Sequence, residues 1–81
     1  MFVRFNTSLE DVIVNTDKII FCSKSDSTDN AALPRFSSHS YINILFDEPS
    51  GNGWKSIDFE YPQYRDKAYE KLIALLDPAV I

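Results

Sequence analysis

The sequence has few of the residue types from which most catalytic and metal sites are built. It contains one cysteine, Cys22, and one histidine, His39. A single thiol cannot form an intramolecular disulfide, and this chain alone cannot assemble a thiolate metal site. We therefore predict a protein without a bound metal or cofactor.

The same scarcity argues against catalysis. His39 is flanked by serines, but no glycine-flanked nucleophile turn accompanies it, so a solvated loop histidine is favoured. Cys22 would need a lowered pKa to act as a nucleophile, and its Ile-Ile-Phe-Cys context is typical of a small buried hydrophobe. Asp58 and Glu60 lie two residues apart, as acids on exposed strands commonly do. We predict that the protein is not an enzyme.

Basic residues are also few. Eight Lys and Arg against twelve Asp and Glu give a net charge of −4. Binding to nucleic acid or to an anionic membrane requires a basic surface, so neither kind of binding is expected. We expect a protein partner, and a basic surface on that partner would complement this charge.

Long apolar runs are absent. No stretch approaches the roughly 20 apolar residues of a membrane-spanning helix, and residues 1–6 hold no run of signal-peptide length. We therefore expect a cytoplasmic protein. The 81 residues, 44% of them hydrophobic and 14% aromatic, predict a single small domain over residues 1–81 with a packed core.

The strongest periodic pattern predicts an amphipathic helix after Tyr61-Pro62. Pro62 suits a first helical turn because it lacks an N–H, and Asp77-Pro78 should stop the helix. Apolar residues recur at helical spacing to form the buried face: Tyr64, Ala68, Leu72 and Leu76, with Tyr69, Ile73 and Leu75 beside them. Charged residues fall opposite and are predicted to be solvated: Arg65, Asp66, Lys67, Glu70 and Lys71.

The rest of the chain predicts strands that this helix covers. Apolar alternation and turn signals mark five segments: Phe2–Asn6, Asp11–Asn15, Ile19–Cys22, Tyr41–Phe46 and Trp54–Tyr61. The third is apolar on both faces, which predicts a central strand or one lying between the helix and a loop. Alternatively, the second and third form one bent strand with a bulge near Thr16. In the last segment, Ile57, Phe59 and Tyr61 should face inward. The predicted fold class is α+β, an antiparallel sheet of about five strands with one C-terminal amphipathic helix packed on one face.

Residues 23–40 interrupt these patterns. The stretch is rich in serine, shows no period, and has the composition of a long mobile loop. Leu33, Arg35 and Phe36 flank Pro34, and we predict that they form an anchor or a small apolar contact held out from the body.

The candidate binding residues are exposed aromatic and charged side chains. Aromatic residues and arginine are typical interface anchors, and the acids would form a rim around them. The set is Arg35, Phe36, Tyr41, Asp47, Glu48, Trp54, Asp58 and Glu60. The alternative is that the rings close a second small cluster under the long loop.

The layout resembles a known plan. The order of short strands, the Val14-Asn15-Thr16-Asp17-Lys18-Ile19 turn, the hairpin and the closing helix are similar to small bacterial and phage proteins with a pleckstrin-homology-like strand meander plus helix. The resemblance implies a module that binds and rarely catalyses.

Small size, acidity and exposed aromatic residues lead to one functional hypothesis. We predict a non-catalytic protein-binding module, of the kind that phages or mobile elements encode to inhibit a bacterial machine, such as an anti-CRISPR or other anti-defence inhibitor. The alternative is a small-molecule-sensing domain or small enzyme with the 23–40 loop as a lid. A homodimer is also expected, through the poorly protected edge of the Phe2–Asn6 strand or through an open sheet face.

Overall fold

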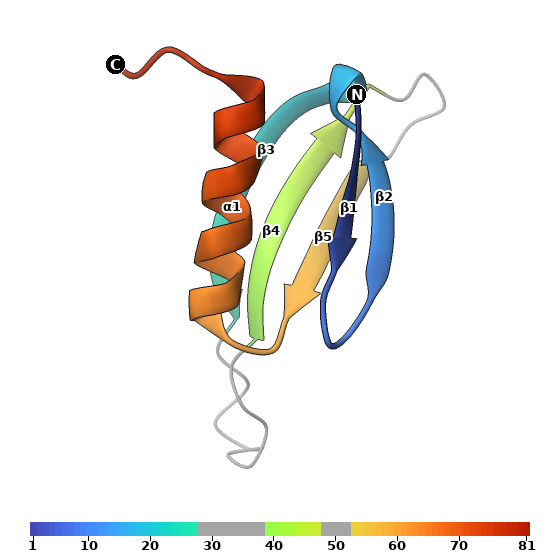
Figure 1. The fold of residues 1–81 in the computed structure, drawn as a ribbon, viewed down its shortest axis with the longest axis vertical. Helices are drawn as coiled ribbons and strands as arrows, with labels where there is room; N and C mark the ends of the chain where they lie inside the picture. The colour runs from blue at the N-terminus through green and yellow to red at the C-terminus, as the bar shows by residue number, and fades with distance from the viewer. Residues whose placement is uncertain (28–38, 48–52) are drawn as a thin grey trace.

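The computed structural model describes residues 1–27, 39–47 and 53–81 (Figure 1). The elements in chain order are β1 (Phe2–Asn6), β2 (Asp11–Asn15), the 3-10 turn η1 (Thr16–Lys18), β3 (Ile19–Ser27), β4 (His39–Phe46), β5 (Trp54–Phe59) and α1 (Pro62–Leu76). The predicted α+β class with one C-terminal helix is confirmed.

The strands form two sheets, so the prediction of a single five-stranded sheet is wrong. β1 and β2 make an antiparallel hairpin, and β3, β4 and β5 make a three-stranded antiparallel sheet in that order. The chain leaves β2 through η1, where the Asn15 side chain accepts a hydrogen bond from the Asp17 N–H. After this turn the chain enters β3, the first strand of the three-stranded sheet. The bend foreseen near Thr16 is therefore a 3-10 turn and not a bulge.

The hairpin and α1 lie on the same face of the three-stranded sheet, with β1 on the α1 side of the hairpin (Figure 1). α1 contacts all three strands of that sheet. Both layers contribute to one core, which consists of Phe5, Val14, Ile42, Ile44, Ile57, Phe59 and Leu72. Large apolar side chains from the hairpin, the three-stranded sheet and α1 thus pack together in one core.

β3 and β4 are longer than their sequences indicate. The loop assigned to residues 23–40 begins with five more residues of β3 and ends with two of β4, and residues 28–38 lie outside the described part. Polar side chains form hydrogen bonds across the sheet. The Asn43 amide on β4 donates to the Ser25 hydroxyl on β3 at 2.8 Å, and the Ser56 hydroxyl on β5 donates to Asn43 at 2.8 Å. A polar strand face has the composition of a loop, which is why the prediction missed it.

β3 is an edge strand of its sheet, and β4 is the central one. The apolar character of β3 on both faces therefore did not indicate a central position. Ile19 and Cys22 pack against the core, whereas Phe21 faces away from it.

α1 begins at Pro62 and ends at Leu76, as predicted. Asp77 adopts the left-handed conformation, with φ of 49°, and its N–H donates to the Ile73 carbonyl at 2.8 Å. Pro78 then prevents a further turn. Among the described residues, no helix has the length and apolarity needed to cross a membrane.

Three helix and strand predictions need correction. Arg65, assigned to the solvated face, is buried, with 5% of its surface exposed. Tyr61, assigned to the inner face of the last strand, follows the end of β5 and is exposed, as is Tyr64. The apolar face of α1 is thus rotated relative to the sheet, and part of it stays uncovered.

Candidate functional site

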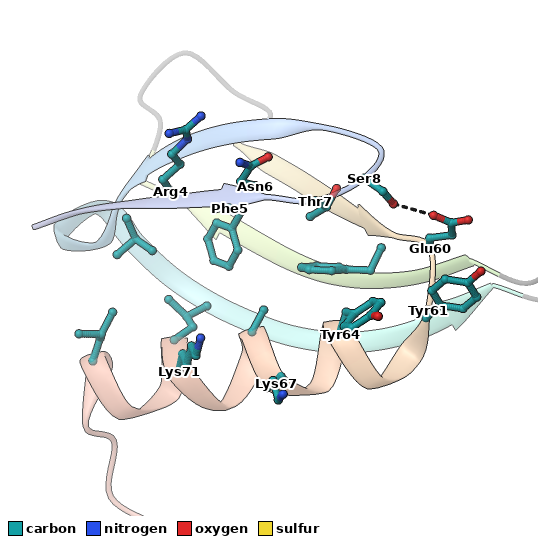
Figure 2. Close-up of a pocket in the computed structure, with 15 residues that line it drawn as sticks. Arg4, Phe5, Asn6, Thr7, Ser8, Glu60, Tyr61, Tyr64, Lys67 and Lys71 are labelled. Atoms are coloured by element: carbon teal, nitrogen blue, oxygen red, sulfur yellow. Dashed lines mark hydrogen bonds between the residues drawn. The ribbon is translucent and has the colours of Figure 1, made fainter.

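A cleft of about 660 Å³ lies between β1 and α1 (Figure 2). We call it the β1–α1 cleft. One wall is β1 with the start of the hairpin turn, the other is a face of α1, and the end of β5 completes it. Its described lining residues are Val3, Arg4, Phe5, Asn6, Thr7, Ser8, Phe59, Glu60, Tyr61, Tyr64, Lys67, Ala68, Lys71, Leu72 and Leu75.

The β1 wall presents an unpaired strand edge. The Thr16 N–H donates to the Met1 carbonyl and the Thr7 N–H donates to the Glu10 carbonyl, each at 2.8 Å, so the hydrogen-bonded pairs of the hairpin fall at odd positions of β1. Antiparallel pairing alternates, so the N–H and C=O groups of the even positions, Phe2, Arg4 and Asn6, point away from β2. Among the described strands, none pairs with that edge.

Successive side chains of β1 point alternately toward α1 and away from it. Phe5 points toward α1 and is buried, whereas Arg4 points away from α1 (Figure 2). The Arg4 guanidinium forms two hydrogen bonds with the Asp11 carboxylate on β2, at 2.8 and 2.7 Å. This bidentate pair lowers the pKa of Asp11 and holds Arg4 over the hairpin.

The α1 wall is the uncovered part of the apolar helix face. Leu72 is buried beneath it and Ala68 is partly buried, whereas Tyr64 and Leu75 are about half exposed. The ring of Tyr61 meets that of Tyr64 edge to face, with centroids 5.8 Å apart, at one end of the cleft. The Glu60 carboxylate at this end accepts a hydrogen bond from the Ser8 hydroxyl at 2.8 Å, linking β5 to the hairpin turn (Figure 2).

The charge of the cleft differs from that of the chain. Lys67 and Lys71 are exposed on the α1 wall, one helical turn apart (Figure 2). Neither makes an ion pair with another residue of the described ranges. In a chain of net charge −4, this wall offers two cationic groups without described partners.

Glu10 fixes the hairpin to the three-stranded sheet. Its carboxylate accepts one hydrogen bond from the Lys55 ammonium and another from the Asp58 backbone N–H, both at 2.7 Å. Burial by itself raises the pKa of Glu10, but these two hydrogen bonds and the Lys55 charge outweigh it, so the pKa is lowered overall. Through these two hydrogen bonds Glu10 links the hairpin turn to Lys55 and to the backbone of β5.

Arg65 fixes α1 to the sheet. Its Nη1 donates to the Ser25 carbonyl at 2.7 Å and lies 3.1 Å from the Asp26 carboxylate, while its Nε donates to Asp66 at 2.7 Å. The hydrogen bond from Arg65 is the main cause that lowers the pKa of Asp66. Both walls of the cleft are thus bonded to the three-stranded sheet.

The structure distributes the predicted binding residues over several places. Tyr41, Trp54 and Asp58 lie on the face of the three-stranded sheet that points away from α1, where Trp54 meets Phe21 edge to face at 5.8 Å. Glu60 lines the β1–α1 cleft instead. The remaining members of the predicted set are Asp47, which is exposed after β4, and Arg35, Phe36 and Glu48, which lie outside the described residues.

Other candidate groups are not in the cleft. Cys22 is partly buried on β3, and burial raises the pKa of its thiol, which opposes a nucleophilic role. His39 begins β4. The described part of the chain contains no group of three or more His, Cys, Asp or Glu that could hold a metal ion.

Sequence reasoning missed most of the cleft, above all Tyr64, Lys67 and Lys71. It assigned the first to the core and the two lysines to a solvated stripe. The available signal was the breadth of the apolar helix face, seven residues in fifteen, which is wider than one side of a small sheet can cover.

Comparisons with known proteins gave no match to a family model, to a curated protein or to a solved structure. The resemblance to pleckstrin-homology-like proteins therefore stays a prediction.

Proposed function

We propose that this chain is a non-catalytic protein-binding module whose β1–α1 cleft receives an extended segment of a partner protein. The segment pairs with the free edge of β1 as an added strand. The observation that supports this most directly is that the unpaired edge of β1 borders a cleft whose opposite wall is an uncovered apolar helix face.

The backbone supplies part of the binding. Phe2, Arg4 and Asn6 each offer an N–H and a C=O to the incoming strand. An exposed strand edge recruits other chains unless it is blunted, and β1 has no proline and carries one charge, on Arg4. The cleft gives this recruitment a defined place.

The side chains of the cleft supply the remainder. Tyr61 and Tyr64 offer large aromatic surfaces at one end, and Leu75 offers apolar surface at the other. Aromatic residues of this kind dominate protein interfaces because they bury much area with few rotatable bonds. Glu60, the one carboxylate among the described lining residues, already binds Ser8, which favours a binding role for the cleft over acid–base catalysis.

A small-molecule site is the second candidate. The cleft volume of about 660 Å³ lies within the range of roughly 300–1,000 Å³ typical of such sites, and Phe59 and Leu72 give it apolar lining. Such a ligand would use the cleft without the backbone groups of β1. The two candidates therefore differ in whether the edge of β1 is needed.

The test starts from random seven-residue peptides displayed on phage and selected on the purified protein. We expect sequences enriched on the wild type to lose binding to Ala68→Trp, which fills the cleft, and to keep it on Ala74→Trp. Ala74 is an exposed alanine on α1 outside the cleft, so it gives a matched control. Because Ala68 packs against the core, circular dichroism and denaturation midpoints check that each variant is folded before its binding is compared.

The selected peptides then report on strand addition. N-methylation of one backbone amide removes a donor without changing the protein. Methyl groups at alternate positions of the peptide should abolish binding, and those at the intervening positions should be tolerated, because only alternate residues face β1. Equal tolerance at every position, or no enrichment over Ala68→Trp, would contradict the proposal.

The identity of the partner is a further proposal. Inhibition of a bacterial machine by a phage-encoded protein agrees with the small size and acidity of the chain. A lid role for residues 23–40 falls mostly on residues outside the described ranges.

A further inference from the structure

We infer that the segment bound in the β1–α1 cleft carries two carboxylate residues separated by one residue, with an apolar residue two positions beyond each. This inference rests on the proposed function and adds the chemistry of the partner. In sequence terms the segment reads apolar, any, acid, any, acid, any, apolar.

The side chains of an added strand have a fixed direction relative to those of β1. Neighbouring strands of one sheet point their side chains to the same faces in register. Phe5 of β1 points toward α1 and Arg4 points away (Figure 2). A strand added to β1 therefore turns every second side chain toward α1 and the others toward solvent beside Arg4.

The spacing of two lysines on α1 matches the spacing of side chains on a strand. Lys67 and Lys71 are four residues apart on α1, which separates them by about 6 Å along the helix axis. Side chains two residues apart on a strand are separated by about 6.6 Å. β1 and α1 run alongside one another in the cleft (Figure 2), so two successive α1-facing side chains of the segment come opposite the two lysines.

The charge of these two lysines favours acidic residues in the segment. Lys67 and Lys71 have no ion-pair partner within the described ranges, whereas the nearby Arg4 is already paired with Asp11. Carboxylates opposite the lysines complete two ion pairs at the mouth of the cleft. A basic segment, which the acidity of the whole chain predicts, would place like charges together there at a cost.

The cleft positions on either side of the two lysines favour apolar residues in the segment. Beyond Lys67 the next helical position of the cleft is Tyr64, and beyond Lys71 it is Leu75. Both side chains are about half exposed and apolar in their larger part. Glu60 lies at the Tyr64 end and repels a further acid, so an apolar residue is the better match at that position.

The test uses fluorescein-labelled seven-residue peptides and fluorescence anisotropy at low salt. The first carries leucine at both ends, glutamate at positions three and five, and threonine elsewhere. The second has glutamine for both glutamates, and the third has lysine. We expect the glutamate peptide to bind about three- to tenfold more tightly than the glutamine peptide, and this ratio to shrink as salt is added.

Variants locate the effect. Lys67→Glu and Lys71→Glu should remove the preference for glutamate, and the double variant should prefer the lysine peptide. Lys18→Glu makes the same change of charge on η1, away from the cleft, and should keep the preference. All three lysines are exposed, so the variants retain the fold.

Different results would contradict the acidic recognition and the proposed function. Equal affinity for the glutamate and glutamine peptides overturns the inference of acidic recognition, while strand addition at β1 stands. If no peptide binds the wild type more tightly than the Ala68→Trp variant, the proposed function itself fails.

Discussion

At the residue scale, two charged side chains set the geometry of the cleft. Arg65 brings a guanidinium to backbone carbonyls of β3 and β4, and Glu10 brings a carboxylate to Lys55 and to the edge of β5. Both cross between elements far apart in sequence. Neither role follows from the local sequence, because a sequence pattern predicts exposure from the helical or strand period alone. By that pattern an arginine or a glutamate is expected to be solvated.

Removing the Arg65 side chain should destabilise the protein. Arg65→Ala leaves the Ser25 carbonyl without its 2.7 Å donor in a partly buried place, which should cost about 2–3 kcal/mol. Lys67→Ala, two residues along the same helix and exposed, should change the free energy of unfolding by less than about 0.5 kcal/mol. Urea denaturation compares the two, and equal losses would show that Arg65 has no such clamping role.

Acid should weaken the attachment of the hairpin. The pKa of Glu10 is lowered in the folded protein from its ordinary 4.5, so its contribution is present above that value and is lost as the pH falls below it. The lowered pKa values of Asp11 and Asp66, ordinarily 3.8, act in the same direction. Glu10→Gln should be less stable at pH 7 and should lose less stability than the wild type between pH 7 and pH 3, as thermal melts can record. Parallel curves for the two proteins would contradict this role of Glu10.

At the element scale, the sequence predicts where helix and strands begin more accurately than how they pair. The start and end of α1, the strands β1 and β2, and the buried Ile57 and Phe59 agree with expectation because local signals determine them. The chain passes from one sheet to the other through η1, a three-residue turn that resembles many others in sequence. The polar halves of β3 and β4 were missed because Ser25 and Asn43 satisfy each other across the sheet.

Substitutions at Leu72 and Leu75 distinguish the packing of α1 against the sheet from its contribution to the cleft. Leu72→Ala should cost about 3–4 kcal/mol because Leu72 is 1% exposed at the seam between α1 and the sheet. Leu75→Ala, at a position 47% exposed, should cost less than about 1 kcal/mol while weakening peptide binding. Similar denaturation midpoints for the two variants would show that the seam lies elsewhere.

At the scale of the whole molecule, the cleft exists because two pieces share one face of a small sheet. The hairpin and α1 each cover part of that face, and the space between them is lined by whatever neither piece buries. Of the candidate residues proposed from sequence, Glu60 alone among those described lies there. The rest were chosen for exposure, and exposure alone does not reveal which side chains line a common concavity.

The homodimer expected from sequence stays a prediction, and the sheet face away from α1 is the surface on which we test it. Phe21, Leu45 and Trp54 form a row across the three strands on the face away from α1. We expect light scattering at micromolar concentration to give twice the chain mass of 9.3 kDa, and Trp54→Ala to restore the monomer. A wild-type mass of 9.3 kDa would contradict the dimer.

Amide hydrogen exchange measured residue by residue shows whether a partner strand pairs with the free edge of β1. In the free protein, the N–H groups of Val3 and Phe5 should be protected by β2, and those of Arg4 and Asn6 should exchange rapidly. With a selected peptide bound, Arg4 and Asn6 should become protected, while Ser56 on the far edge of β5 stays unchanged. Binding that leaves the exchange of Arg4 and Asn6 as fast as in the free protein would contradict strand addition.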